Sequence, residues 1–192
     1  MKSLKLSKFQ TFLCLEEKLN QFDVVRFREE IYFLRNHNYY DVIMRDMTKG
    51  EFEKIFSEIA ELNGFKSAFG GWVKKSNECI VTLNLLKPAY KDFYHFSIKV
   101  FVQGLTGKEY SLSDSLFKKD FSHLTLNGPR EYNSLFDFDM SMNDKDRLCI
   151  LRNLFSDFIM PVTEKVLSKS GIRELSKRGS IQLLPIVKAI LG

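Results

Sequence analysis

The fold is decided by residues 64–107, which read GFKSAFGGWVKKSNECIVTLNLLKPAYKDFYHFSIKVFVQGLTG. Strict alternation of apolar and polar residues over 78–86, and again over 93–103, predicts two antiparallel strands joined by a short turn at 87–92. An aromatic and glycine-rich segment, residues 65–75, precedes them and begins the predicted meander. One face of this sheet is apolar, with Cys79, Val81, Leu83, Leu85, Tyr94, Phe96, Ile98, Val100 and Val102. Helices must cover this face, because an exposed apolar sheet face would promote aggregation.

The opposite face of the predicted sheet carries polar side chains and is expected to be open to solvent. Its residues are Thr82, Asn84, His95, Ser97 and Lys99. A turn centred on Ala89 and Tyr90 would place Asn84 opposite His95. In the same register Thr82 lies opposite Ser97. The predicted binding surface on this face consists of Asn84, Tyr90, His95, Ser97 and Lys99. Acid–base catalysis by His95, beside Ser97 and Lys99, is the alternative for these groups.

Hydrophobic periodicity outside the sheet predicts helices at both ends of the chain. The predicted fold class is α+β: an antiparallel meander of about four strands with helices packed on one face and at both chain ends. Residues 1–192 are expected to form a single domain. Within it, 1–47 is a helical segment, 48–140 is a helix plus the sheet, and 141–192 contains further helices.

Local signals refine this outline. Thr48 and Glu51 have the spacing of a capping box, which starts the helix before the sheet. Residues 136–139 alternate Phe and Asp and are a candidate fourth strand. Pro161 interrupts a long helical pattern, so it is expected to kink that helix or to start a new one.

The composition is that of an ordinary globular protein, with 44% apolar and 28% charged residues in 192. The 18 phenylalanines are interpreted as core filling. The formal net charge of +5 is small, and the basic residues are interleaved with acidic ones, which favours a generic surface over a nucleic-acid site. The nucleic-acid alternative would use Lys66, Lys74, Lys75 and Lys99 around Trp72 and Tyr90. Burial of Trp72 is the favoured interpretation.

Three cysteines, Cys14, Cys79 and Cys149, stand far apart and form no CxxC pair, which is typical of a reducing compartment. Cys79 and Cys149 are both expected to be small buried side chains. The chain begins without the apolar run of a signal peptide and has no apolar stretch of membrane-spanning length. A cytoplasmic location without membrane contact is therefore predicted.

Asp137 and Asp139 are a candidate metal site, because alternation would place both carboxylates on one side of a strand. The pattern is weak, and the nearby Asp144 fits a helix start better. There is no GxSxG, no phosphate-binding glycine loop and no metal-ligand spacing of cysteine or histidine. The prediction is that the protein has neither a metal ion nor a cofactor.

The chain resembles the bacterial domain of unknown function 4304. The resemblance rests on residues 64–66, on 72–76, on the strand ending Leu86-Lys87-Pro88, and on Asp92-Phe93-Tyr94 before an alternating strand. It covers roughly residues 48–160. It implies a compact α+β domain and no established activity, so no functional residues can be transferred.

The leading functional prediction is a small, cytoplasmic, non-catalytic protein-binding protein, such as a bacterial immunity or antitoxin protein that neutralises a partner. This prediction is based on the sequence pattern of a globular domain in which no set of catalytic residues is recognised. Two alternatives stay open: a nucleic-acid-associated protein that uses the basic and aromatic sheet face, and an enzyme that uses His95 or the pair Asp137 and Asp139.

Overall fold

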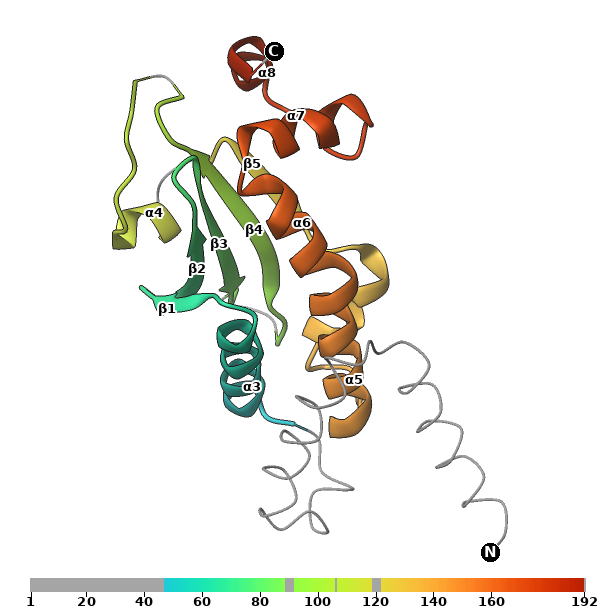
Figure 1. Cartoon of the computed structure of the whole chain (residues 1–192). Coiled ribbons are helices and arrows are strands. Elements are labelled where there is room, and N and C mark those ends of the chain that lie inside the picture. The colour runs from blue at the N-terminus through green and yellow to red at the C-terminus, as the bar shows by residue number, and fades with distance from the viewer. Residues whose placement is uncertain (1–46, 89–91, 106, 119–121, 192) are drawn as a thin grey trace, which may run out of the picture. The chain divides into compact units, whose positions relative to one another are not determined.

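The computed structural model of the chain describes residues 47–88, 92–105, 107–118 and 122–191 (Figure 1). The chain divides into two units, residues 1–44 and 45–192, and all described residues belong to the second. The helical segment predicted for residues 1–47 therefore lies outside the described residues, apart from Met47.

Helix α3, Lys49–Leu62, starts at the predicted capping box. The Oγ1 atom of Thr48 accepts a hydrogen bond from the backbone N–H of Glu51 at 3.3 Å, and Oε2 of Glu51 accepts one from the backbone N–H of Thr48 at 2.9 Å. These bonds satisfy two N–H groups that lack partners in the first turn. The helix ends at Asn63, and Gly64 follows with φ +82°, a conformation that favours glycine.

Five antiparallel strands form one sheet in the order β1-β2-β3-β4-β5. Their bounds are β1 Lys66–Ala68, β2 Gly71–Lys75, β3 Cys79–Leu86, β4 His95–Val102 and β5 Leu124–Asn127. The predicted antiparallel meander is confirmed, with five strands in place of about four.

The strand predicted at residues 136–139 is wrong. Residues Arg130–Phe136 form a 3₁₀ helix, η1, and Asp137 makes only an isolated bridge to Phe93. The reason is that the consecutive side chains Leu135 and Phe136 are both buried in the core. A strand would send them to opposite faces, whereas a 3₁₀ turn allows both to point inward.

The register of β3 against β4 differs from the predicted one by two residues. Asn84 pairs with Ser97 and Leu86 pairs with His95, so β3 ends at Leu86 and β4 begins at His95. Side chains alternate with a period of two, so an even shift leaves every residue on its predicted face.

Helix α3 packs its phenylalanines against the apolar face of the sheet, as predicted. The ring of Phe56 lies 4.6 Å from Trp72 and 6.0 Å from Phe96, and it also meets Phe155 of the C-terminal helix at 5.1 Å. Figure 1 shows α3 and the long C-terminal helix beside the strands. All nine apolar-face residues of the meander belong to or pack against this core.

A second, smaller cluster lies on the opposite face of the sheet. Leu116 and Phe117 of helix α4, Asp114–Lys118, pack there with three strand residues, Val73, Ile80 and Phe101. The predicted coverage of one face by helices is therefore incomplete. Alternation shows which side chains share a face, but it does not show which segments return to cover that face.

The C-terminal helices begin at Asn143, whose side chain accepts a hydrogen bond from the backbone N–H of Asp146 at 2.9 Å. They are α5 Asp144–Leu154, the π-helical turn η2 Phe155–Ile159, α6 Met160–Val166, α7 Lys169–Lys177 and α8 Pro185–Leu191. Pro161 lies in the first turn of α6, directly after η2, and the helical backbone continues from η2 into α6. A π turn widens the backbone just before the proline ring, which cannot be accommodated in a regular α-helical interior.

Candidate functional site

Of the four described residues of the predicted binding surface, Asn84 and Ser97 are buried, and so is Thr82 on the same face. Thr82, Asn84 and Ser97 expose 0%, 4% and 9% of their surface, respectively. The Asn84 side-chain amide donates to Oγ1 of Thr82 at 2.9 Å. These polar groups are therefore used inside the fold, and the prediction that they form an open surface is wrong. Tyr90 lies outside the described residues.

Two lysines of the nucleic-acid alternative are also engaged, Lys99 on this face and Lys74, paired with Val81, on the apolar face. The ammonium of Lys99 donates to the backbone carbonyl of Phe117 at 2.7 Å, which ties α4 to the sheet. Lys74 donates to the carbonyl of Asn63 at 3.0 Å. Trp72 is buried as favoured, and its indole N–H donates to Oγ of Ser57 at 2.9 Å. The Trp72 ring is thus not available for stacking on a base.

His95 is the described residue of the predicted surface that remains exposed. It is paired across the strands with Leu86, whose side chain is 50% exposed. The ring of Phe93 meets the imidazole edge to face, with centroids 4.5 Å apart. We call Leu86, Phe93 and His95 the sheet-end surface.

Several contacts hold the segment that carries this surface in place. The N–H of Tyr94 donates to the carbonyl of Phe136 at 2.9 Å, and the N–H of Phe138 donates to the carbonyl of Asp92 at 2.8 Å. Asp92 forms an ion pair with Lys49, and the hydrogen bond from this ammonium holds the pKa of the carboxyl below its usual value. The sheet-end surface is therefore anchored to both α3 and η1.

Tyr94 adds a further contact with α3, because its hydroxyl donates to Glu53 of that helix. Burial, together with this carboxylate, raises the pKa of the phenol well above its usual value. The phenol accordingly stays neutral and serves as a structural hydrogen-bond donor.

The candidate metal pair does not assemble. Oδ1 of Asp137 accepts the backbone N–H of Asp139 at 3.0 Å, which is a local turn. Over the described parts of the chain, no three His, Cys, Asp or Glu side chains are grouped closely enough to hold a metal ion.

The two described cysteines, Cys79 and Cys149, differ in burial. Cys79 is buried as predicted, and burial raises the pKa of its thiol to about 12. A thiol of that pKa is a poor nucleophile near neutral pH. The predicted burial of Cys149 is wrong, since this residue lies on the exposed side of α5.

His123 is a structural histidine that sequence reasoning did not find. Its Nδ1 accepts the backbone N–H of Val102 at 2.8 Å, where β4 ends. The neutral ring must then carry its proton on Nε2, which lies 3.3 Å from the hydroxyl of Tyr110. Burial lowers the pKa of His123 from 6.5, and the nearby Lys108 lowers it further.

This arrangement predicts a loss of stability in mild acid. Between the lowered folded pKa of His123 and about 6.5, the unfolded chain binds a proton that the folded chain does not, so stability falls as the pH decreases through this range. We expect His123→Gln to reduce the difference in unfolding free energy between pH 7.5 and 5.5, as measured by urea titration. An equal pH dependence in both proteins would show that His123 is not the group responsible.

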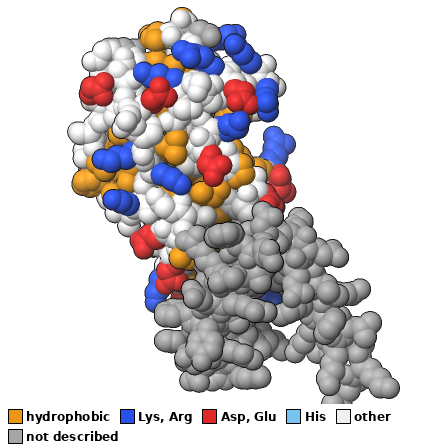
Figure 2. Space-filling model, viewed as in Figure 1, with side chains coloured by type: hydrophobic (Ala, Val, Ile, Leu, Met, Phe, Trp, Pro, Cys, Tyr) orange, Lys and Arg blue, Asp and Glu red, His pale blue; other side chains and the backbone are white. Residues whose placement is uncertain are grey.

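A second exposed region lies on the last two helices. Its large apolar side chains, Leu184, Ile186 and Ile190, are 55%, 59% and 49% exposed. We call the α7–α8 surface the set Arg173, Lys177, Arg178, Leu184, Ile186, Lys188 and Ile190. Figure 2 shows basic side chains gathered with apolar ones over this end of the domain. An open hollow of about 380 Å³ lies along α7, lined by Ser170, Arg173, Glu174, Lys177 and Arg178.

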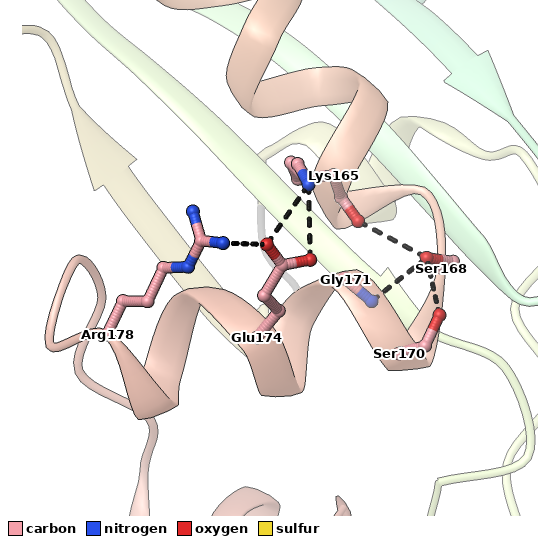
Figure 3. A network of polar contacts seen from close by, with 6 residues as sticks. All are labelled: Lys165, Ser168, Ser170, Gly171, Glu174 and Arg178. Atoms are coloured by element: carbon pink, nitrogen blue, oxygen red, sulfur yellow. Dashed lines mark hydrogen bonds and ion pairs between the residues drawn. The ribbon is translucent and has the colours of Figure 1, made fainter.

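The position of α7 is set by a polar network at its junction with α6 (Figure 3). Ser168 caps α7 by accepting the backbone N–H of Gly171 at 3.0 Å. Lys165 and Arg178 contact Glu174 at 3.1 and 2.8 Å, and these cations hold the pKa of its carboxyl below the usual value. Arg173 donates to the carbonyl of Leu191, which joins α7 to α8.

The close packing at the α6–α7 junction also explains why residue 171 is a glycine. A Cβ atom at this position would lie 2.1 Å from the carbonyl oxygen of Lys165. We expect Gly171→Ala to lower the free energy of unfolding by about 1–3 kcal/mol, even though alanine favours helix by about 1 kcal/mol. Thermal denaturation would measure this change. Gly50→Ala in α3 is the matched control, because nothing lies within 4 Å of its added Cβ, and it should not destabilise.

No family model, curated protein or solved structure matches this chain. The resemblance to the bacterial domain of unknown function 4304 stays a prediction. In the described part of the chain, none of the helices combines the length and the apolar character needed to cross a bilayer.

Proposed function

We propose that this chain is a non-catalytic protein-binding protein and that its partner docks on the sheet-end surface. The observation that carries the proposal is the exposed cross-strand pair of Leu86 and His95, with the ring of Phe93 against the imidazole. Aromatic side chains such as that of Phe93 are enriched at the cores of protein interfaces.

Rigidity of the site supports this proposal. The ion pair between Lys49 and Asp92 and the backbone bonds of Tyr94 and Phe138 hold the segment before β4. A surface that is already ordered loses less conformational entropy when a partner binds. Such preorganisation suits a protein that must bind and neutralise another protein, as immunity and antitoxin proteins do.

The chemistry of the polar groups supports binding over catalysis. Asn84, Thr82 and Lys99 donate or accept hydrogen bonds within the fold. Among the described residues, no hydrogen-bond partner orients the ring of His95, whose neighbours are Phe93 and Leu86. A general base needs such an orienting group and a nearby reacting atom.

Site-specific photo-crosslinking tests the proposal. A benzophenone side chain would replace Leu86 in the cells that encode this chain, and it should capture one discrete protein. The matched control places the same group at Leu112, another partly exposed leucine, where this adduct should be missing. His95→Asp should reduce the adduct at position 86 by roughly tenfold or more, because it puts an unpaired charge into the interface. Equal adducts at both positions, or none at 86, would contradict the proposal.

A further inference from the structure

We propose that the α7–α8 surface attaches this protein to a bilayer surface rich in anionic lipids. This inference goes beyond the proposed function and uses none of the residues of the sheet-end surface. It rests on the net positive charge of residues 165–191, on the exposed aliphatic side chains of this surface, and on the absence of aromatic side chains from these residues.

The net positive charge of the chain is concentrated at this end. Residues 165–191 contain six Lys and Arg residues and one acidic residue, a net charge of +5 that equals the formal net charge of the whole chain. The acidic residue, Glu174, is neutralised from both sides by Lys165 and Arg178. An approaching anionic surface therefore meets cations without an opposing unpaired carboxylate, which is the pattern that attracts anionic lipid headgroups.

The outer side of α8 is apolar. Ile186 and Ile190 are one helical turn apart and half exposed, and Leu184 precedes the helix with similar exposure. The inner side chains Val187 and Leu191 are buried in the core, so α8 is fixed to the domain while it presents its other side. Aliphatic side chains beside cations suit the boundary between headgroups and acyl chains.

The composition of this surface favours a bilayer over other anionic partners. Residues 165–191 contain no aromatic side chain, so they offer no platform for stacking on nucleic-acid bases. Protein interfaces pair groups at fixed positions, whereas a bilayer supplies many anionic headgroups above an apolar layer. The α7–α8 surface, which combines four cations with three exposed aliphatic side chains, matches the bilayer. The proposal concerns the surface of the bilayer, and no described helix is long and apolar enough to cross it.

Vesicle sedimentation with the full chain tests this inference. We expect binding to vesicles of about 70% phosphatidylcholine and 30% phosphatidylserine to exceed binding to pure phosphatidylcholine by roughly tenfold or more at about 0.1 M salt. Ile186→Glu with Ile190→Glu should lower binding to the anionic vesicles by a similar factor. Lys177→Gln with Arg178→Gln should also weaken it, and should reduce its dependence on salt.

The matched control is Leu112→Glu with Met140→Glu, which places two glutamates at exposed apolar positions elsewhere and should leave vesicle binding unchanged. Circular dichroism melting checks that each variant is folded. Equal binding to both kinds of vesicle would overturn the proposal. It would also be overturned if the Ile186/Ile190 variant bound normally, or if the chain bound a DNA duplex or an acidic protein through this surface but not the anionic vesicles.

Discussion

Replacing Phe56 with alanine should lower the free energy of unfolding by about 3–5 kcal/mol. The side chain is fully buried, and its ring joins three parts of the core: Trp72 of β2, Phe96 of β4 and Phe155 of the C-terminal helix. Alanine would leave a cavity between elements that cannot all move to fill it. Urea denaturation followed by fluorescence of the single tryptophan would measure the change.

The control for Phe56 lies on the same helix. Leu62 in the last turn of α3 is 50% exposed, so Leu62→Ala should change the unfolding free energy by less than about 1 kcal/mol. Similar losses in the two variants would contradict the assignment of Phe56 to the centre of the core.

Replacing Arg147 with methionine should cost about 3–5 kcal/mol. This arginine is 2% exposed, and its guanidinium donates to the carbonyl oxygens of Leu135, Asp137 and Met140. It also lies over the ring of Phe138 at 4.3 Å. Methionine would fill much of the volume but would leave these carbonyls without their donors, and buried unsatisfied acceptors are costly.

The matched variant is Lys145→Met, an exposed cation two residues earlier on α5, which should have little effect. Thermal and urea unfolding of both variants would measure the two changes in unfolding free energy. Equal stability of the two would show that Arg147 does not hold the segment after η1.

Alternation was sufficient to predict the faces of the sheet but not their surroundings. Val81, Leu83 and Ile98 lie in the core because a period of two places them on one face. The same reasoning assigned Asn84 and Ser97 to solvent, yet both are buried. Polar residues are exposed only on average. Here α4 packs on their face of the sheet and accepts a hydrogen bond from Lys99, and no local sequence pattern predicts that a later segment covers this face.

The helical pattern contained a signal for Arg147 that was missed. Arg147, Leu151 and Leu154 recur at helical spacing, so all three belong to one buried stripe of α5. A cation within an apolar stripe predicts a nearby group of acceptors. The exposed position of Cys149 follows from the same spacing, since it falls outside that stripe.

Of the candidate site, only the His95 end of the meander could be predicted from sequence. The pairing of Leu86 with His95 was not predicted, and neither were the contacts of Asp92 and Tyr94 with α3 and η1, because these contacts join residues far apart in the sequence. The α7–α8 surface was missed because the net charge was considered over the whole chain, and a tally over residues 165–191 would have revealed it.

The most direct test of the central claim is the affinity for the protein that is captured at position 86. Calorimetric titration should compare the unaltered chain with the double variant Leu86→Ala, His95→Ala. Because a single hot-spot residue contributes about 2 kcal/mol or more and such contributions do not simply add, the account predicts that the double variant binds this partner at least about 30-fold more weakly. Affinity within about twofold of the unaltered chain, with the variant fully folded, would contradict it.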